Sequence, residues 1–365
     1  MSRTTLVISN DFPPRIGGIE NFVATVCDLL DGDVVVLTSD HPDAAAHDRE
    51  LSFPVHRLPG PLLPTGALAE RGLDLLHRYR ASRIVYGAAA PLGLLGDRLR
   101  PTATRQFALS HGHEVWWASL PGSRRLLRRI GDRVDAISTI SGYAAARIAP
   151  ALSAPARARL VRLPPPIDPA FTATAGERAP GPPVVLAAAR MIRQKGLDTL
   201  IEAWRLLRRD HPDLPGRLRL LGDGPQRPAL LRRAAGLADV EFGGGVPHPA
   251  MPAELARAAL FAAPVRTRLG GLNPEGLGLA MLEAAAVGLP VLVGDSGGAP
   301  ETVTRSSGLV LPDDPYAWSA ALAALLADPA RRAAMGAAGR DHVRDPFGTA
   351  AARRTLRTAL DLPLE

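Results

Sequence analysis

The chain has 365 residues, a length typical of two domains that each bury a core. Its apolar content is 46%, and no apolar run approaches the roughly 20 residues that a membrane-spanning helix needs. The net charge of +7 favours anionic partners only weakly, and no aromatic-interleaved basic motif or zinc-ligand spacing indicates a nucleic-acid-binding protein.

The first residues and the cysteine content bear on where the protein resides. Residues 2–8 enter a strand pattern directly, so we expect no signal peptide. Cys27 is the single cysteine and cannot form an internal disulfide, which fits a reducing compartment. We therefore expect a cytoplasmic protein.

The chain begins with a strand, a glycine turn and a helix. Residues 5–9 are β-rich, Gly17 and Gly18 lie in the following loop, and residues 19–30 have helical spacing of apolar side chains. Glycines before a helix let the backbone approach a ligand, and the free N–H groups of the helix then face an anion. This turn is a candidate phosphate site, although its spacing is not that of the dinucleotide-binding GxGxxG motif.

More strand patterns, each followed by a loop or helical segment, fill the first half of the chain. They cover residues 33–38, 83–86, 106–110 and 136–139. Repeated βα units predict a parallel sheet with helices on both faces and ligands beyond the strand C-termini. His111 and His113 lie at such a terminus, where a histidine suits a structural hydrogen bond as well as a catalytic role.

A basic helix is predicted over residues 121–130. It carries four arginines beside aliphatic residues, and Trp116 and Trp117 come just before it; the arginines are Arg124, Arg125, Arg128 and Arg129. Such a helix can lie on an anionic membrane surface with the arginines on lipid headgroups. An ordinary amphipathic helix with a solvated basic face fits equally well.

A segment rich in Pro, Gly and Ala, residues 166–183, predicts an irregular linker between an N-terminal domain, 1–165, and a C-terminal domain, 184–346. After the linker the alternation restarts, with strands at 184–188, 217–221, 240–242, 260–263 and 290–293. The last helical segment follows Asp345-Pro346-Phe347, so we expect residues 347–365 to pack back on the first domain.

Arg190 and Lys195 follow the first strand of the second domain, five residues apart. Two cations at this place would clamp a diphosphate and neutralise a phosphate leaving group. Lys195 is the only lysine among 43 basic residues. A compact ammonium suits a crowded phosphate site better than a planar guanidinium, although one lysine could also survive by chance.

A glycine-rich loop, residues 270–278, leads into a helical segment at 279–287. Glu275 in the loop and Glu283 in the helix are a little over two turns apart, so both can face one cleft. Carboxylates accept hydrogen bonds from the vicinal hydroxyls of a sugar or ribose. The pattern predicts a nucleotide-sugar site; a solvated helix with two surface glutamates is the alternative.

Taken together, Arg190-x4-Lys195, Glu275-x7-Glu283, Gly222-Asp223-Gly224-Pro225 and the Gly17-Gly18 loop resemble the retaining glycosyltransferases of family 4. That resemblance implies an α/β protein of the GT-B fold, with two Rossmann-like parallel-sheet domains facing a central cleft. Residues 10–14 and 16–19, 111–114 and 120–124, and 275–278 and 294–301 resemble, more narrowly, the actinobacterial PimB-type phosphatidylinositol-mannoside α-mannosyltransferases. Asn273-Pro274 and Met281 fall where that narrower group varies or carries other residues.

The resemblance implies a role for each matching residue. Arg190 and Lys195 would hold the donor diphosphate, Glu275 the sugar hydroxyls and Glu283 the ribose. His111 would contact the sugar near its reacting face, with His113 as second candidate. The full donor-binding set is Gly17, Gly18, Arg190, Lys195, Gly222, Asp223, Asn273, Glu275, Gly276, Leu277, Gly278 and Glu283. The acceptor or membrane side comprises Asp11, His113, Arg124, Arg125, Arg128 and Arg129.

The implied reaction is transfer of a hexose, most simply mannose from GDP-mannose, to a hydroxyl of a lipid-linked acceptor such as a phosphatidylinositol mannoside. The enzyme would act peripherally at the inner face of the cell membrane. The carboxylate pair of a retaining glycosidase is not evident, so retention implies front-face attack, in which the departing phosphate takes the acceptor proton. No Asp-x-Asp metal motif lies in a suitable loop, so we expect neither metal nor cofactor.

Two other functions remain open. One is a UDP- or GDP-sugar-dependent transferase with a soluble natural-product or saccharide acceptor. The other is a non-catalytic sugar-nucleotide-binding scaffold, against which the intact Arg190, Lys195, Glu275 and Glu283 argue.

Overall fold

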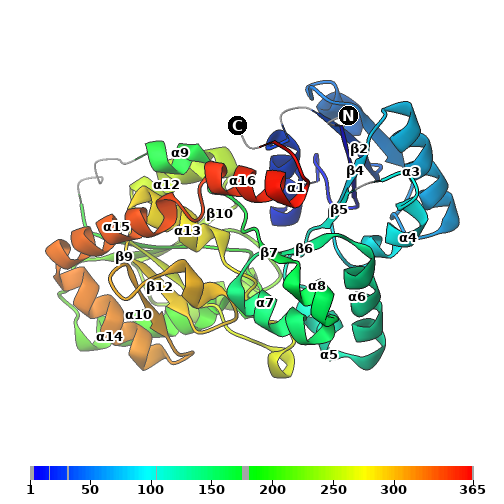
Figure 1. The fold of residues 1–365 in the computed structure, drawn as a ribbon. Helices are drawn as coiled ribbons and strands as arrows, with labels where there is room; N and C mark the ends of the chain where they lie inside the picture. The colour runs from blue at the N-terminus through cyan, green and yellow to red at the C-terminus, as the bar shows by residue number, and fades with distance from the viewer. Residues whose placement is uncertain (1–3, 16, 31–32, 104, 175–180, 364–365) are drawn as a thin grey trace. The chain divides into compact units, whose positions relative to one another are not determined.

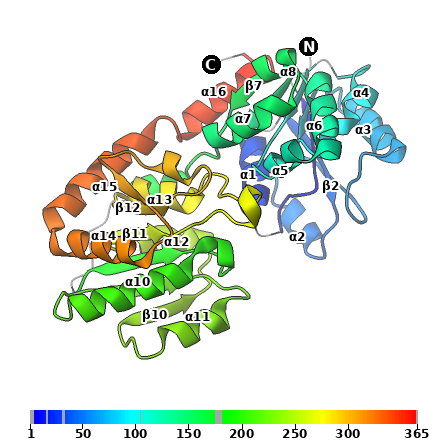
Figure 2. The ribbon, with the colours of Figure 1, turned by 90° about the horizontal axis from the view of Figure 1, so that it is seen from below.

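The computed structural model describes residues 4–15, 17–30, 33–103, 105–174 and 181–363. The chain divides into two compact units (Figures 1 and 2). Unit 1 comprises Met1–Pro165 and Thr349–Glu365, and unit 2 comprises Pro166–Gly348. The C-terminal segment therefore groups with the start of the chain.

Unit 1 is built on a parallel sheet with the strand order β3-β2-β1-β4-β5-β6-β7 in the described residues. Its strands are β1 (Thr5–Ser9), β2 (Val34–Ser39), β3 (Val55–Leu58), β4 (Arg83–Tyr86), β5 (Arg105–Ala108), β6 (Ala136–Thr139) and β7 (Leu160–Arg162). Val7 of β1 pairs with Val36 on one side and Val85 on the other. β1 and β2 are buried along their whole length, as apolar strands covered by helices on both faces should be.

The helices of unit 1, apart from the C-terminal one, lie in the chain between these strands. They are α1 (Gly18–Asp28), α2 (Ala44–Asp48), α3 (Gly66–Arg78), α4 (Gly96–Leu99), α5 (Glu114–Ser119), α6 (Pro121–Arg133), α7 (Gly142–Ile148), α8 (Ala154–Ala158) and the C-terminal α16 (Thr349–Ala359). The strand order reverses between β1 and β4, so the loops that follow these two strands diverge and can receive a ligand.

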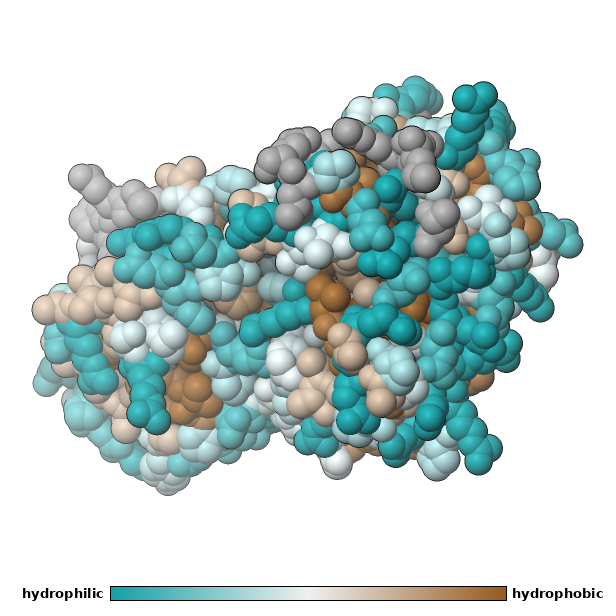
Figure 3. All heavy atoms as spheres, viewed as in Figure 1, coloured by the Kyte–Doolittle hydropathy of each residue, from teal (hydrophilic) through white to brown (hydrophobic). Residues whose placement is uncertain are grey.

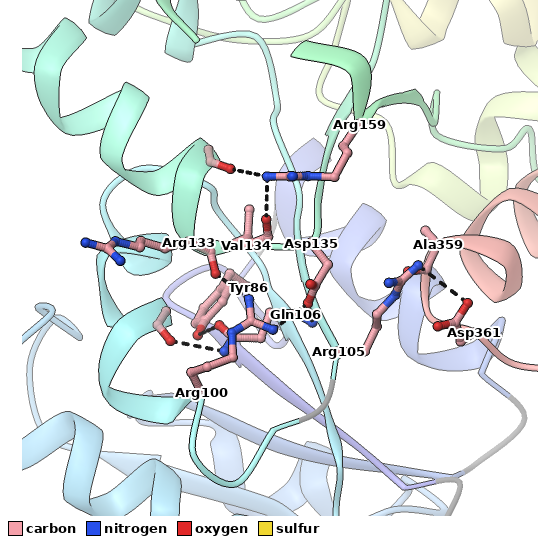
Figure 4. A network of polar contacts seen from close by, with 12 residues as sticks. Tyr86, Arg100, Arg105, Gln106, Arg133, Val134, Asp135, Arg159, Ala359 and Asp361 are labelled. Carbon is pink, nitrogen blue, oxygen red and sulfur yellow. Dashed lines mark hydrogen bonds and ion pairs between the residues drawn. The ribbon is translucent and has the colours of Figure 1, made fainter. Parts of the chain in front are cut away.

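The segment after α16 is tied to unit 1 by two arginines at the N-terminal ends of its strands. Arg83 Nε donates to the carbonyl of Leu360 at 2.7 Å, and Arg105 Nε donates to that of Ala359 at 3.1 Å. Figure 4 shows Arg105 reaching Ala359 and Asp361, beside a buried network in which the Tyr86 hydroxyl donates to Gln106. Charged donors hold these carbonyls of the C-terminal segment in place.

Unit 2 contains a second parallel sheet, with the order β10-β9-β8-β11-β12-β13 in its described residues. The strands are β8 (Val184–Ala188), β9 (Arg217–Leu221), β10 (Val240–Gly244), β11 (Leu260–Ala263), β12 (Val291–Gly294) and β13 (Gly308–Leu311). The helices are α9 (Pro169–Ala173), α10 (Leu197–Asp210), α11 (Arg227–Ala234), α12 (Met251–Ala256), α13 (Leu279–Val287), α14 (Pro315–Ala327) and α15 (Pro329–Arg344). The prediction of two Rossmann-like parallel-sheet domains is confirmed.

The predicted irregular linker, residues 166–183, is wrong in its first half. Residues 169–173 form α9, because the Asp168 carboxylate accepts a hydrogen bond from the Ala170 N–H and Pro169 occupies the first helical position. Phe171 is fully buried and anchors this short helix, which packs against α13. Residues 175–180 of the predicted linker lie outside the described residues.

Each unit has its own core. Leu6, Leu37 and Tyr86 belong to the core of unit 1, and Trp204 and Trp318 to that of unit 2. Both buried indoles have hydrogen-bond acceptors, at Asp239 and the Pro312 carbonyl. On the face seen in Figure 3, apolar residues form only scattered patches among hydrophilic ones, as expected once the large apolar side chains are inside.

Candidate active site

The candidate site in unit 2 lies where its strand order reverses. The reversal occurs between β8 and β11, so the loops that leave these strands diverge at this point. Arg190 and Lys195 follow β8, and Glu275 lies in the loop between β11 and α13. All three line one cavity of about 240 Å³, together with Gly278 at the start of α13.

Lys195 and Glu275 form an ion pair inside this cavity. Lys195 Nζ lies 2.6 Å from Glu275 Oε2, and the two side chains are only 24% and 12% exposed. Sequence reasoning had assigned these residues to separate ligands, whereas the structure joins them. The ammonium has three N–H donors, so this contact leaves two for an anion.

The turn that carries Lys195 requires a glycine. Gly196 has φ of 64°, and a Cβ added there would lie 1.8 Å from the Pro264 carbonyl oxygen. Only glycine combines the left-handed backbone with so close an approach to another chain segment. The Lys195 turn is thereby fixed against the loop that leaves β11.

The Glu275 loop is held by its own backbone and by the glycine turn that follows β12. Glu275 N–H donates to Ser296 Oγ at 3.1 Å, and the Gly298 N–H donates to the Glu275 carbonyl at 2.9 Å. Gly297 has φ of 58°, and a Cβ there would lie 2.0 Å from that same carbonyl. The second glycine turn therefore acts as a support that sets the position of Glu275.

Arg190 is the exposed member of the set. Within the described ranges its guanidinium has no hydrogen bond or ion pair, so its five N–H donors are available to a ligand. The Gly222-Asp223-Gly224 turn packs against the backbone next to Arg190, where the Met191 N–H donates to the Asp223 carbonyl at 2.7 Å. A Cβ on Gly222 would lie 2.1 Å from the Ala189 carbonyl oxygen, which explains this glycine.

Other residues predicted for donor binding in unit 2 do not line the cavity. Leu277 is buried, and Asn273 forms an antiparallel backbone bridge with Arg268. The predicted residues outside the cavity lining are Gly222, Asp223, Asn273, Gly276, Leu277 and Glu283.

Glu283 lies on α13 with an exposed fraction of 8% and contacts a histidine that sequence reasoning missed. His248 Nε2 is 3.0 Å from Glu283 Oε1. The hydrogen bond with Glu283 raises the pKa of His248, and partial burial opposes this shift. The sequence feature that could have identified His248 is its position just after β10, at the C-terminal end of a strand.

In unit 1, His111 follows β5 and is held by backbone and side chains. Its Nε2 forms a hydrogen bond with the Gly87 carbonyl, and its ring meets Phe22 edge-on at 5.8 Å. Burial lowers the pKa of His111, while the charge of Glu114 opposes the shift. Because a carbonyl only accepts, a neutral His111 carries its proton on Nε2 and leaves Nδ1 as an acceptor.

Glu114, which sequence reasoning left without a role, organises the same corner. It is fully buried, and its Oε2 accepts hydrogen bonds from Ser110 Oγ at 2.8 Å and the His111 N–H at 3.2 Å. His113 Nε2 lies 3.4 Å from Glu114 Oε1, and the His111 and His113 rings stack at 6.3 Å. The structure thus places both candidate histidines side by side.

The other predicted residues of unit 1 lie on its first loop. Gly17 caps α1 with extended backbone, and Gly18 begins that helix. Asp11 contributes to the electrostatic environment of His111. Ile16, part of the motif that carried the family resemblance, lies outside the described residues.

The four arginines predicted for a membrane face are not equivalent. Arg124 donates to the Pro150 carbonyl at 2.7 Å, and Arg129 pairs with Asp97 at 3.3 Å. Arg125 and Arg128 are exposed and have no partner in the part of the chain that the structure describes. Leu127 and Ile130 face the core, so the exposed apolar side chains nearby are instead Trp116, Leu120 and Leu126.

The described residues contain neither a candidate membrane-spanning helix nor a candidate metal-binding cluster. No helix there is long and apolar enough to cross a membrane. No group of three or more His, Cys, Asp or Glu side chains in the same ranges could hold a metal ion.

Comparison with known proteins decides the family. The model of the group 1 glycosyl transferases matches residues 182–328. A GDP-mannose-dependent monoacylated α-(1-6)-phosphatidylinositol monomannoside mannosyltransferase of Corynebacterium glutamicum is 40% identical over 358 residues, covering 94% of this chain and 93% of that protein. The corresponding α-(1-6)-phosphatidylinositol monomannoside mannosyltransferase of Mycolicibacterium smegmatis is 40% identical over 361 residues, covering 93% and 94%. This chain belongs to the phosphatidylinositol monomannoside mannosyltransferase family.

Membership in this mannosyltransferase family makes the protein a glycosyltransferase, and it confirms the resemblance inferred from the motifs. The fold agrees with solved glycosyltransferases. Anabaena Alr3699/HepE in complex with UDP aligns with a TM-score of 0.81 at 15% identity, covering 98% of this chain and 99% of that one. At that identity the likeness concerns the two-domain GT-B architecture alone.

Proposed function

We propose that the protein transfers mannose from GDP-mannose to a hydroxyl group of a phosphatidylinositol mannoside, with retention of configuration and without a metal ion. The full-length likeness to enzymes named for this reaction supports the substrates. The observation that carries the chemistry is the cavity at the β8–β11 reversal, where Arg190, Lys195 and Glu275 converge.

Donor binding follows from the charges in that cavity. Arg190 and two of the three Lys195 N–H donors bind the diphosphate, while the third holds Glu275. Glu275 accepts hydrogen bonds from mannose hydroxyls. As the anomeric bond breaks, negative charge grows on the leaving phosphate, and the two preorganised cations stabilise it.

Acceptor activation needs no protein base in this proposal. The leaving phosphate oxygen takes the proton of the attacking hydroxyl on the same face of the sugar, which preserves the configuration. A neutral His111 cannot act as an acid, so we assign it to positioning: its Nδ1 accepts a hydrogen bond from a substrate hydroxyl.

We assign the lipid side to unit 1. The exposed Arg125 and Arg128 lie near the exposed Trp116, Leu120 and Leu126 in sequence, a composition that suits an anionic membrane surface. Peripheral binding through this surface would bring the lipid acceptor to the enzyme.

The test is incubation of the purified protein with a panel of nucleotide sugars, with and without phosphatidylinositol mannoside. We expect lipid-dependent GDP release from GDP-mannose, an α-linked mannolipid product by NMR, and full activity in EDTA. Preference for a UDP-sugar or a soluble acceptor would replace the proposed substrates. Nucleotide binding without any transfer would indicate a scaffold, and loss of activity in EDTA would reject metal independence.

A further inference from the structure

The carboxylate of Glu283 has one partner in the described part of the chain, and that partner is His248. Glu283 lies on α13 with an 8% exposed residue surface, and its Oε1 is 3.0 Å from His248 Nε2. A carboxylate this buried needs a hydrogen-bond donor. His248 starts the short turn His248–Ala250 that follows β10, so it reaches α13 from a different strand.

The other side of the imidazole faces α9. The rings of His248 and Phe171 lie 5.3 Å apart with a 57° angle between their planes, and Phe171 is fully buried. Asp168, the N-cap of α9, acts electrostatically on His248 and favours its protonated form. The charged groups that act on this imidazole are therefore two acids, Glu283 from α13 and Asp168 from the start of unit 2.

We propose that His248 is a positioning residue for nucleotide binding, which fixes one oxygen of Glu283 so that the other is presented to the ribose hydroxyls. A carboxylate has two oxygens and about four acceptor positions, so the His248 contact leaves room for two vicinal hydroxyls. Holding the side chain in one rotamer before the ligand arrives lowers the entropy lost on binding. This inference rests on the proposed function and on the ribose-binding role that the family resemblance implies for Glu283.

The decisive experiment compares two ligands by calorimetry: GDP, and 2′,3′-dideoxy-GDP, which lacks both ribose hydroxyls. We expect His248→Ala to weaken GDP roughly 5- to 10-fold, the size of one hydrogen bond, and to leave dideoxy-GDP binding unchanged. In turnover assays the same variant should raise the KM for GDP-mannose and leave kcat near wild type. Equal loss for both ligands, or no loss for either, would overturn the proposal.

The pH dependence provides a second readout. A hydrogen bond from a charged donor is stronger, so protonated His248 holds Glu283 best. Since the pKa of His248 is raised above the ordinary value of about 6.5, wild-type affinity for GDP should be highest below that raised pKa and fall as pH rises through it. His248→Gln keeps an N–H donor without titrating, so its affinity should not change across this range; a profile like that of wild type would contradict the proposal.

A matched control is His342→Ala, which removes another histidine of unit 2 that packs against a phenylalanine, Phe347 at 5.9 Å. The His342→Ala variant should bind both ligands like wild type. If His248→Ala fails to fold, His248→Gln replaces it in the experiment. Loss of the His248 role and loss of the Glu283 ribose role give different results in this experiment. If wild type discriminates against dideoxy-GDP and Glu283→Gln loses that discrimination while His248→Ala keeps it, only the present inference fails. If wild type binds both ligands equally, the ribose role of Glu283 itself fails.

Discussion

At the scale of single residues, the structure gives Lys195 a second role. Lys195 is both a candidate phosphate ligand and the ion-pair partner of Glu275. Its loss would remove a cation and leave the largely buried Glu275 carboxylate unpaired, and an unpaired charge of this kind is costly. Arg190 has no such second duty, because no described residue pairs with it.

We predict that Lys195→Ala and Arg190→Ala each lower turnover roughly 10²-fold or more, equivalent to about 2.7–4 kcal/mol of lost charge stabilisation. Lys195→Ala should also disturb the sugar contacts of Glu275, so it should be the more damaging of the two. The control is Arg193→Ala, an exposed arginine in the same turn. Steady-state kinetics with GDP-mannose measures all three, and near-normal turnover in both site variants would reject the phosphate-clamp assignment.

The two glutamates should separate into a catalytic and a binding residue. Glu275→Gln should mainly lower kcat, because its hydroxyl contacts belong to the reacting sugar. Glu283→Gln should mainly weaken nucleotide binding, because its contacts are remote from the breaking bond. Titration of GDP against each variant, beside turnover at saturating donor, measures the difference. The reverse pattern would exchange the two assignments.

At the scale of elements, α6 shows how one helix divides its side chains between core and surface. Leu127 and Ile130 are fully buried, whereas Leu126 and the arginines remain exposed. Two of those arginines are already engaged by the Pro150 carbonyl and Asp97. The surface that we propose for lipid binding is therefore smaller than the four arginines suggest, and it includes Trp116 and Leu120 from the preceding segment.

We predict that Arg125→Gln with Arg128→Gln weakens binding to acidic vesicles. At about 1 kcal/mol for each basic residue near an anionic surface, the pair contributes roughly 2 kcal/mol, or about 30-fold in affinity. The matched control is Arg124→Gln with Arg129→Gln, which removes the same charge but should lower the melting temperature more and vesicle binding less. Sedimentation at low and high salt measures both. Unchanged binding of the first variant would leave α6 with an ordinary solvated face.

At the scale of the whole molecule, both ends of the chain contribute to unit 1. Besides buried apolar side chains such as Leu356, the link includes hydrogen bonds from two charged donors: Arg83 and Arg105, at the starts of β4 and β5, donate to the carbonyls of Leu360 and Ala359. Hydrogen bonds from charged donors are each worth about 1.5–3 kcal/mol. The position of α16 therefore depends in part on two side chains that lie 277 and 254 residues away from their partners in sequence.

We predict that Arg83→Ala with Arg105→Ala loosens α16. Amide hydrogen exchange in residues 349–359 should speed up, and that in α15 should stay as in wild type, because the lost contacts belong to unit 1. The control is Arg71→Ala, which breaks a surface pair with Asp74 that is worth little. Protection of α16 equal to that of wild type would mean that apolar packing holds it without these bonds.

The strands show where sequence reasoning works and where it stops. The central strands β1, β4, β6, β8, β9 and β11 match the predicted ranges because they are apolar and mostly buried. The strands that were not predicted, β3, β7 and β13, are all edge strands of the two sheets. β3 and β7 mix apolar and basic side chains and carry no continuous apolar signal. β13 is different, because its residues Leu309–Leu311 are apolar and that signal was missed.

By itself, the sequence determined the fold class and the mannosyltransferase family, and it singled out Arg190, Lys195 and Glu275 as candidate site residues, because strand periodicity and motif spacing are local properties that a chain carries in its order. Only the tertiary structure showed what these residues contact: Lys195 pairs with Glu275, Glu283 pairs with His248, and Leu127 packs into the core. Such pairings join residues from different βα units, 80 positions apart for the first of them. Side chains so distant in sequence meet only when the sheet order and the glycine turns place their loops together, and no local pattern encodes that meeting.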